Sequence, residues 1–393
     1  MREDLRQLFK KYASGTLIFK NKEVLQMSYL PDHLLHREKE IEEIVAALAP
    51  VLRREIPPNL FIYGPPGTGK TAAIHIVGSA LMDAAEEENV PVDFVYLNTG
   101  VDGEANTPYK IFATLSNIFG EPVPHTGLST SIVLERFVCG LDKSGRLAII
   151  VLDEIDKLKG VDEVLYILSR LNSKLKNSRI SLICISNEIK VLQKLDPRTK
   201  SSLSFLEIPF HPYNADEIKD ILEERAQMAF ERGAMDENVI PFCAAYSAKV
   251  HGDLRRALNL LKLSGEIAER KGGKKITVEH VKIAIKKMEE GDILSTIRTL
   301  PTHSKFILKC ILEIGEVSYT GEIYEEYRKT CREYRLKPLT LRRVNDFLNE
   351  LETLGLISCE IISRGRYGRT RRIFPSIDSD IKERVVSLLE GGI

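Results

Sequence analysis

Residues 60–83 read LFIYGPPGTGKTAAIHIVGSALMD, and this stretch decides the fold. A short apolar run typical of a buried strand leads into the pattern G-x-x-x-x-G-K-[ST] over residues 64–71, and an apolar helical pattern follows at once. Glycines allow the backbone to wrap closely around a phosphate, so that its N–H groups face the phosphate oxygens. Strand, glycine-rich loop and helix in this order predict the first unit of an α/β nucleotide-binding sheet.

The rest of the predicted sheet lies on the C-terminal side of that unit. Four more apolar runs, separated by helical patterns, occupy residues 92–98, 147–153, 180–187 and 205–210. They show no alternation of polar and apolar residues, which is typical of parallel strands buried on both faces. We therefore predict a parallel-sheet domain over residues 1–211 that includes an N-terminal extension.

The character of the chain changes after His211. Residues 212–291 contain helical patterns without strand signals, which predicts a small all-helical domain. Residues 292–393 begin with helices and continue with two short strands and a closing helix. Helices followed by a β-hairpin are the order of a winged-helix module. Its expected elements are helices at 302–314, 319–334 and 339–353, and strands at 356–364 and 370–374.

Composition excludes several classes of protein. Formal net charge is zero, with 43% hydrophobic and 28% charged residues, as in ordinary globular proteins. The sequence has no apolar run long enough for a membrane span, and its charged N-terminus does not resemble a secretory signal. The six cysteines form no C-x-x-C pattern, so we expect free thiols in a reducing cytoplasm.

Charged and polar residues at the strand ends suggest phosphoryl chemistry. Lys70 places a positive charge at the β- and γ-phosphates, and the Thr71 hydroxyl can bind Mg²⁺. Asp153 directly follows a buried strand and can orient Mg²⁺, while its neighbour Glu154 can polarise a water molecule. Asn187 closes the next strand and can reach that water or the γ-phosphate. Taken alone, the acidic pair would be a helix cap and the asparagine a turn residue.

Positive charge is concentrated near the C-terminus. Residues 328–372 hold 12 Lys/Arg against 5 Asp/Glu, and the stretch 364–372 reads RGRYGRTRR. Arginines on a narrow, glycine-hinged hairpin suit the minor groove of duplex DNA. Taken alone, this charge excess is also compatible with a solvated surface. With this stretch as the wing of a winged helix, the residues predicted to contact DNA there are Arg364, Arg366, Tyr367, Arg369 and Thr370, with packing on the hairpin as the alternative for Tyr367.

The helix at 339–353 is the expected recognition helix. Its apolar spacing predicts a core-facing stripe made of Leu341, Val344, Phe347, Leu348 and Leu351. The polar residues that then fall on or near the exposed side are Thr340, Arg342, Arg343 and Asn345. The alternative is that the two arginines merely pair with nearby acids.

Four segments together resemble the AAA+ ATPases: GPPGTGKT, LAIIVLDEID, ISLICISN and HGDLRRALNLL. This resemblance implies that Arg255, the first arginine of GDLRRAL, senses the γ-phosphate from a helical lid. It also implies that Arg198 in LDPRTKSSL acts on the nucleotide of a neighbouring subunit. Either arginine taken singly would be a surface ion-pair residue.

A narrower resemblance covers residues 15–375. The segments YLPDHLLHREKEI (29–41), NTPYKIF (106–112), VPHTGLST (123–130), LDPRTKSSL (195–203), GDLRRAL (252–258) and YGRT (367–370) resemble the archaeal replication initiators related to the origin-recognition-complex and cell-division-control ATPases.

That family implies ATP or ADP with Mg²⁺ as ligands. All eight loop residues would line the nucleotide: Gly64, Pro65, Pro66, Gly67, Thr68, Gly69, Lys70 and Thr71. The resemblance adds Tyr213 and Arg225 to this set. It also makes residues 104–130 a helical insert that contacts DNA through Lys110, Thr126, Gly127, Leu128 and Ser129.

The implied function is a DNA replication initiator. It would bind origin duplex DNA sequence-specifically, use slow ATP hydrolysis as a conformational switch, and help to recruit or load the replicative helicase. Paralogous initiators would be further partners, in association with the nucleoid. The alternatives are an AAA+ motor of the Holliday-junction branch-migration type, which predicts DNA-stimulated turnover, and a nucleotide-regulated transcription regulator.

Overall fold

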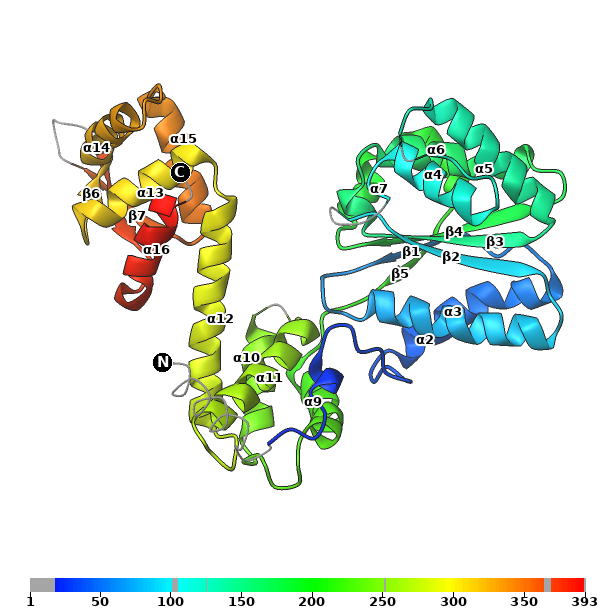
Figure 1. Ribbon diagram of the computed structural model, residues 1–393, viewed down its shortest axis with the longest axis horizontal. Coiled ribbons are helices and arrows are strands. Elements are labelled where there is room, and N and C mark those ends of the chain that lie inside the picture. The colour runs from blue at the N-terminus through cyan, green and yellow to red at the C-terminus, as the bar shows by residue number, and fades with distance from the viewer. Residues whose placement is uncertain (1–17, 101–104, 125, 251, 364–368, 392–393) are drawn as a thin grey trace, which may run out of the picture. The chain divides into compact units, whose positions relative to one another are not determined.

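The computed structural model describes residues 18–100, 105–124, 126–250, 252–363 and 369–391 (Figure 1). The chain forms two compact units, Met1–Val281 and Lys282–Ile393. Within the described ranges no helix is both long and apolar enough to cross a bilayer.

The first unit contains a five-stranded parallel sheet in the order β2-β3-β4-β1-β5. Its strands are β1 (Leu60–Tyr63), β2 (Val92–Asn98), β3 (Leu147–Asp153), β4 (Arg179–Ser186) and β5 (Leu206–Pro209). All five predicted strands are present. Successive side chains of a strand point to opposite faces. In β3, Ile150 and Leu152 accordingly enter the core on one face, and Ile149 and Val151 enter the core on the other.

Helices cover both faces of this sheet (Figure 1). One face carries α2 (Glu38–Leu48) and α3 (Lys70–Glu87), with the 3-10 turn η2 (Ala49–Arg53) between them. The other face is covered by α4 (Pro108–Ile118), α5 (Thr130–Ser144), α6 (Val161–Ser169), α7 (Lys190–Lys194) and α8 (Pro197–Leu203), with the turns η3 (Ile155–Lys157) and η4 (Leu171–Ser173).

The insert between β2 and β3 is a pair of helices whose starts are readable in the sequence. Thr107 caps α4 by accepting a hydrogen bond from the Lys110 N–H, and Pro108 occupies the first helical position, where no backbone N–H is needed. Ser129 caps α5 in the same way. Among its described residues, the predicted insert at 104–130 therefore contains α4 and residues that lead to the start of α5.

Three helices follow the sheet in the same unit: α9 (Ala215–Ala229), α10 (Val239–Lys249) and α11 (Leu254–Arg270). Residues 18–36, here called the strap, pack on these helices and contain the short turn η1 (Glu23–Leu25). The Phe19 ring lies 4.7 Å from that of Phe230, and Lys22 forms a 2.8 Å ion pair with Glu269. This part of the extension, predicted with the sheet domain, thus contacts α9 and α11, which belong to the predicted lid domain.

The second unit has the winged-helix elements expected from the sequence. Its helices are α13 (Thr302–Ile314), α14 (Thr320–Glu333), α15 (Leu341–Thr353) and α16 (Ser379–Gly391), and its antiparallel sheet has the order β6-β8-β7, from β6 (Ser318–Tyr319), β7 (Ile357–Ser363) and β8 (Arg369–Pro375). The two-residue β6 was not predicted, because so short a strand has no readable period.

One predicted core position of α15 is wrong. Leu341 is 43% exposed, whereas Val344, Phe347, Leu348 and Leu351 are buried as predicted. Leu341 lies in the first turn of the helix, before the buried stripe begins, so helical spacing alone overextended the core by one turn.

The helix α12 (Val278–Thr299) continues from the first unit into the second. Gly291, where the sequence suggested the start of a third domain, lies inside this helix, and an added Cβ there would meet nothing within 4 Å. The domain limits at 211 and 291 remain predictions.

Candidate nucleotide site and nucleic-acid surface

The loop between β1 and α3 has a backbone that requires glycine. Gly67 and Gly69 have φ values of 75° and 94°, in the left-handed region that side chains disfavour. A Cβ at Gly67 would also lie 1.8 Å from Asp253 Oδ1, so that the loop and the start of α11 approach each other closely only with glycine there. This cradle fits a phosphate at the N-terminus of α3.

Lys70 is buried at the start of α3 and directs its ammonium into the loop. Its Nζ donates to the carbonyls of Gly64 at 2.7 Å and Pro65 at 2.9 Å, and to Asn187 Oδ1 at 3.0 Å. Burial lowers the Lys70 pKa from 10.5 to about 8, and the positive charge of Arg255 adds to the effect. Nearby carboxylates, Asp153 first, oppose it.

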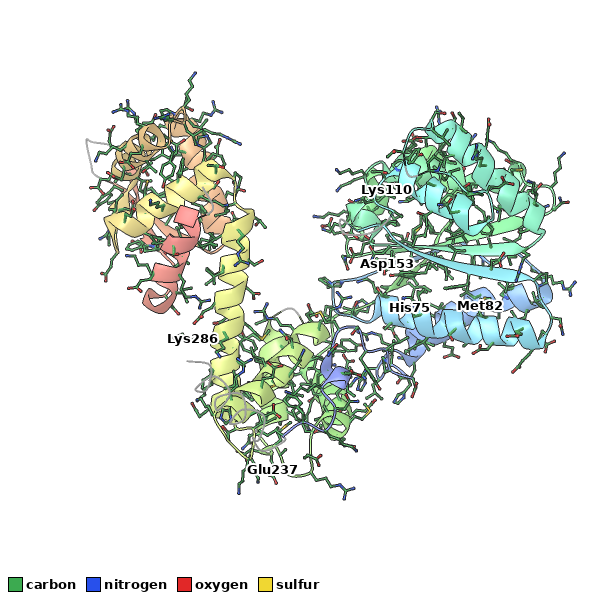
Figure 2. The ribbon with its side chains drawn as sticks, viewed as in Figure 1. His75, Met82, Lys110, Asp153, Glu237 and Lys286 are labelled. Atoms are coloured by element: carbon green, nitrogen blue, oxygen red, sulfur yellow. The ribbon has the colours of Figure 1, made fainter. Side chains whose placement is uncertain are left out.

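Asp153, labelled in Figure 2, ends β3. Its carboxylate is held by three donors. Thr71 Oγ1 and the Tyr96 hydroxyl each donate to Asp153 Oδ2 over 2.7 Å, and the Glu154 N–H donates to Oδ1 over 2.7 Å. Burial, together with the neighbouring Asp153, raises the Tyr96 pKa far above its usual value. A hydroxyl and a carboxylate side by side are the hard oxygen ligands that Mg²⁺ prefers, so these residues fit that ion.

Glu154 is held in an unusual backbone conformation directly after β3. Its φ is 57°, a left-handed value uncommon for a residue other than glycine. Its carboxylate lies against Gly100, where an added Cβ would be 2.3 Å from Glu154 Oε2. The turn therefore places this side chain at the end of β2, beside the strand end that carries Asp153.

Asn187 is held by Asp156, a residue that the sequence analysis did not single out. Asp156 Oδ1 accepts from the Asn187 N–H at 2.9 Å and from the Ser186 hydroxyl at 3.2 Å. The Asn187 side chain is thereby directed to Lys70. Lys70, Thr71, Asp153 and Asn187, four residues predicted from the sequence, thus form one connected group.

A cavity of about 430 Å³ opens beside this group. Its walls come from the strap, the loop with the start of α3, and the lid, including Tyr29, Leu30, Pro31, Leu34, Gly67, Gly69, Thr71, His75, Tyr213, Arg225 and Arg255. An apolar pocket with a few convergent polar groups is the usual form of a small-ligand site.

Tyr213 and Arg225, predicted to line the nucleotide, both line this cavity. Tyr213 is 2% exposed, and the Arg225 guanidinium lies 4.6 Å above the Tyr29 ring. Arg225 Nη1 is buried and has no hydrogen-bond partner among the described residues. Burial lowers the Arg225 pKa. A buried guanidinium with a free donor is suited to an acceptor on a bound ligand.

Arg37 is a further residue of this site that the sequence reasoning missed. It is 3% exposed, and its guanidinium carbon lies 3.7 Å from the centre of the Tyr213 ring. Its nitrogens donate to the carbonyls of Thr68, His36 and His211 at 2.9, 2.7 and 2.6 Å. Arg37 therefore joins the loop, the strap and the segment that leads into the lid. Its place within YLPDHLLHREKEI was the only available signal.

The two remaining predicted arginines differ in position. Arg255 is exposed in the first turn of α11 and lines the cavity. Arg198 is exposed on α8 and does not line it. Within one chain the structure therefore brings Arg255, but not Arg198, to the cavity wall.

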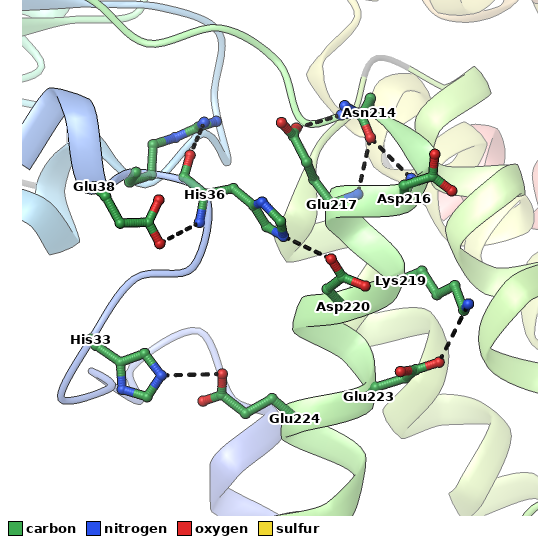
Figure 3. A network of polar contacts seen from close by, with 11 residues as sticks. His33, His36, Glu38, Asn214, Asp216, Glu217, Lys219, Asp220, Glu223 and Glu224 are labelled. Atoms are coloured by element: carbon green, nitrogen blue, oxygen red, sulfur yellow. Dashed lines mark hydrogen bonds and ion pairs between the residues drawn. The ribbon is translucent and has the colours of Figure 1, made fainter.

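Contacts between histidines and carboxylates connect the strap with helix α9 (Figure 3). His36 Nε2 lies 3.0 Å from Asp220, and His33 Nε2 lies 3.4 Å from Glu224. All four side chains are more than a quarter exposed, from 29% for Glu224 to 67% for His33, so solvent screens the contacts and each contributes little to stability. The buried Phe19 ring, packed on Phe230, is a further attachment of the strap.

The predicted DNA-contacting residues of the insert lie on its surface. Lys110, Thr126, Gly127 and Ser129 are exposed, and Leu128 is partly buried against the core. The N-terminal ends of α4 and α5 add backbone N–H groups to this surface, which suits phosphate oxygens.

Helix α15 presents its polar residues as predicted. Thr340 caps the helix, Arg342 and Arg343 are exposed, and Asn345 is partly buried. Arg343 forms a 3.4 Å pair with Asp346 and lies over the Phe347 ring, as the alternative reading anticipated for this residue.

The hairpin tip is only partly described. Arg364, Arg366 and Tyr367 lie outside the described residues. Arg369 begins β8, and Thr370 is paired with Ile362 of β7. Arg371, on the return strand, donates to Asn349 at 2.7 Å and to Glu352 at 3.0 Å, so it ties β8 to α15.

Three family models match consecutive parts of the chain. They are an AAA domain over residues 54–192, a Cdc6 AAA+ ATPase-type lid domain over 219–286, and a CDC6 C-terminal winged helix domain over 295–385.

Curated relatives match almost the whole chain. An ORC1-type DNA replication protein of Thermococcus onnurineus is 46% identical over 379 residues, which cover 94% of this chain and 91% of the relative. An ORC1-type DNA replication protein 1 of Methanosarcina mazei is 44% identical over 391 residues, covering 98% and 94%.

Solved structures agree with these relatives. The Aeropyrum pernix ORC1 protein in complex with DNA is 41% identical, with a TM-score of 0.79 and coverage of 94% of this chain and 97% of that one. Cdc6p from Pyrobaculum aerophilum, at 24% identity and a TM-score of 0.61 over 95% and 99% of the chains, shares the fold.

Proposed function

Because the chain belongs to the archaeal ORC1-type DNA replication proteins, the Orc1/Cdc6 family of AAA+ initiators, we propose that it recognises origin duplexes by sequence and uses ATP as a conformational switch. Membership makes the protein a replication initiator with an AAA+ ATPase domain. The network of Lys70, Thr71, Asp153 and Asn187, in a chain that also carries a winged helix, is the observation that carries the proposal.

We propose that the nucleotide lies in the cavity beside the loop. Residues 64–71 hold the phosphates, with Lys70 neutralising their charge, while Tyr213 and Arg225 contact the remainder of the nucleotide. Thr71 and Asp153 hold Mg²⁺, which when bound neutralises charge on the phosphate oxygens.

Hydrolysis, in this proposal, is slow and depends on groups around the γ-phosphate position. Glu154 polarises the attacking water, and Asn187 orients that water or the γ-phosphate. Arg255 contacts the γ-phosphate from the lid side of the cavity. Arg198, exposed on α8, acts on the nucleotide of a neighbouring copy.

Origin binding would use two surfaces, one on each unit. The first consists of Lys110 and residues 126–129 of the insert. The second is formed by α15 with the wing, through Thr340, Arg342, Arg343, Asn345, Arg364, Arg366, Tyr367, Arg369 and Thr370. Phosphate contacts position a protein on the duplex, and contacts to base edges or groove shape select the sequence.

The bound initiator would then help to recruit or load the replicative helicase at the nucleoid, with paralogous initiators as partners. The solved structure of ORC1 of Aeropyrum pernix in complex with DNA supports DNA as a ligand of this chain.

Footprinting on the protein's own chromosomal DNA tests this function. We expect discrete protected repeats beside a replication start, and protection that weakens steeply as salt rises, because bound arginines release counterions. The double change Arg366→Ala with Arg369→Ala should remove protection and leave ATP binding intact. Uniform protection of all DNA, or none, would contradict sequence-specific origin binding.

A further inference from the structure

The Asp153 carboxylate has a second side-chain donor besides the loop threonine. Tyr96, in the middle of β2, donates from its hydroxyl to Asp153 Oδ2 over 2.7 Å, the same oxygen that Thr71 reaches over 2.7 Å. In the sheet register Tyr96 pairs with Val151 and Asn98 pairs with Asp153. The phenol therefore reaches along the sheet by two residues to meet the carboxylate.

These contacts determine which way each oxygen faces. Thr71 uses its only hydroxyl proton on Asp153, so the lone pairs of Thr71 Oγ1 point away from the carboxylate, where a cation can use them. Asp153 Oδ1 is held by the Glu154 N–H, and Tyr96 holds Oδ2 independently of Thr71. Without the phenol, the Oδ2 side of the carboxylate would depend on the threonine alone.

Tyr96 is itself supported by a residue of the nucleotide cavity. The His75 ring lies 4.5 Å from the Tyr96 ring, tilted by 43°. His75 lies on α3 one turn after Thr71 and lines the cavity, and Figure 2 shows it below the β3 end that carries Asp153. The Tyr96 side chain is therefore held by α3, through the His75 ring, and by the end of β3, through the Asp153 carboxylate.

We propose that Tyr96 is a positioning residue for the Mg²⁺ site at Thr71 and Asp153, acting by fixing the Asp153 carboxylate before the cation arrives. This inference rests on the proposed function, which assigns that site. Groups that orient metal ligands in this way change metal affinity about 10- to 100-fold when they are removed. A purely structural tyrosine would instead change folding stability and leave metal affinity unaltered.

The test compares Tyr96→Phe with Tyr109→Phe, a matched control on α4 that loses a 2.8 Å phenol hydrogen bond to the Pro124 carbonyl, away from the loop. ADP affinity is measured by calorimetry in EDTA, and Mn²⁺ affinity of the ADP-loaded protein by electron paramagnetic resonance. For Tyr96→Phe we expect ADP affinity in EDTA within twofold of the wild type and Mn²⁺ affinity lower by about tenfold. Tyr109→Phe should match the wild type in both measurements.

Each of the other outcomes contradicts a different part of the proposal. Wild-type Mn²⁺ affinity in Tyr96→Phe would refute the positioning role and leave the proposed metal site standing. An ADP affinity in EDTA that falls as much as the Mn²⁺ affinity would show that Tyr96 supports the fold or the nucleotide, which also refutes the inference. If the wild type binds no Mn²⁺ with ADP, the proposed metal site itself fails.

Discussion

All three guanidinium nitrogens of Arg37 donate hydrogen bonds to backbone carbonyls. Two of these carbonyls belong to segments far away in the sequence: Thr68 in the loop and His211 in the segment that leads into the lid. Lysine has one compact ammonium and cannot reproduce this planar arrangement. A single buried side chain therefore links the loop to the segment that leads into the lid.

We expect Arg37→Ala to lower the free energy of unfolding by about 3 kcal/mol, because the buried carbonyls of Thr68 and His211 lose charged donors. Arg37→Lys should recover less than half of that loss. Urea unfolding measures both. The control Arg53→Ala removes an exposed pair with Glu55 and should leave the unfolding midpoint unchanged, and an Arg37→Ala variant as stable as this control would contradict the interpretation.

Lys70 gives the site a pH dependence. Its pKa of about 8 means that the ammonium is largely charged at pH 7 and largely neutral above pH 9. A phosphate beside it favours the charged form and raises the pKa. We expect ADP binding to take up close to one proton at pH 9 and almost none at pH 6.5, with affinity falling as pH rises through this window.

Calorimetry in buffers of different ionisation enthalpy measures that uptake directly. The uptake at pH 9 should disappear in Lys70→Arg, because arginine keeps its charge throughout this range. Equal uptake in the wild type and in Lys70→Arg would assign the proton to another group.

Helix α15 carries two adjacent arginines that differ in their ion pairing. Arg343 is paired with Asp346, whereas Arg342 is exposed and has no ion pair among the described residues of this unit. We expect Arg342→Ala to weaken duplex binding at every salt concentration and to reduce the slope of log affinity against log salt by about one.

Arg343→Ala should have the smaller effect on that slope, because its charge is already partly neutralised by Asp346. Fluorescence anisotropy with one duplex at four salt concentrations measures both variants, with Arg328→Ala, paired with Glu325 on α14, as the control. Equal slopes of log affinity against log salt for Arg342→Ala and the wild type would show that α15 does not belong to the DNA-binding surface.

The elements were predictable from the sequence where local signals act alone. Buried parallel strands, the loop glycines, the Thr107 and Ser129 caps and the α15 stripe all follow from short-range patterns. Arg37, Tyr96 and Asp156 were missed for one physical reason: each works through a partner at least 30 residues away, and a single sequence carries no record of such pairings. The strap was assigned to the sheet domain for the same reason, since its contacts with Phe230 and Glu269 lie across the chain.

For the whole molecule, the second unit contains a core of its own. Phe306, Tyr327, Leu348 and Ile373 are fully buried within it. A domain of this size with its own core can fold independently. We expect a fragment of residues 282–393 to unfold cooperatively on heating and to bind duplex DNA more weakly than the full chain, since it lacks the insert.

Circular dichroism and anisotropy on that fragment provide the check. A fragment without a cooperative transition would show that the two units depend on each other for folding. A fragment that binds DNA as tightly as the full chain would remove the insert from the DNA surface.

The left-handed backbone conformation of Glu154 lowers the folding stability of the whole protein. Its left-handed backbone disfavours any side chain by about 1 kcal/mol or more, and a glycine there would relieve that strain. Replacement by glycine should therefore leave melting unharmed or raise it slightly while abolishing turnover. In the proposed function this glutamate polarises the attacking water, so heat resistance and turnover would make opposite demands on one backbone position.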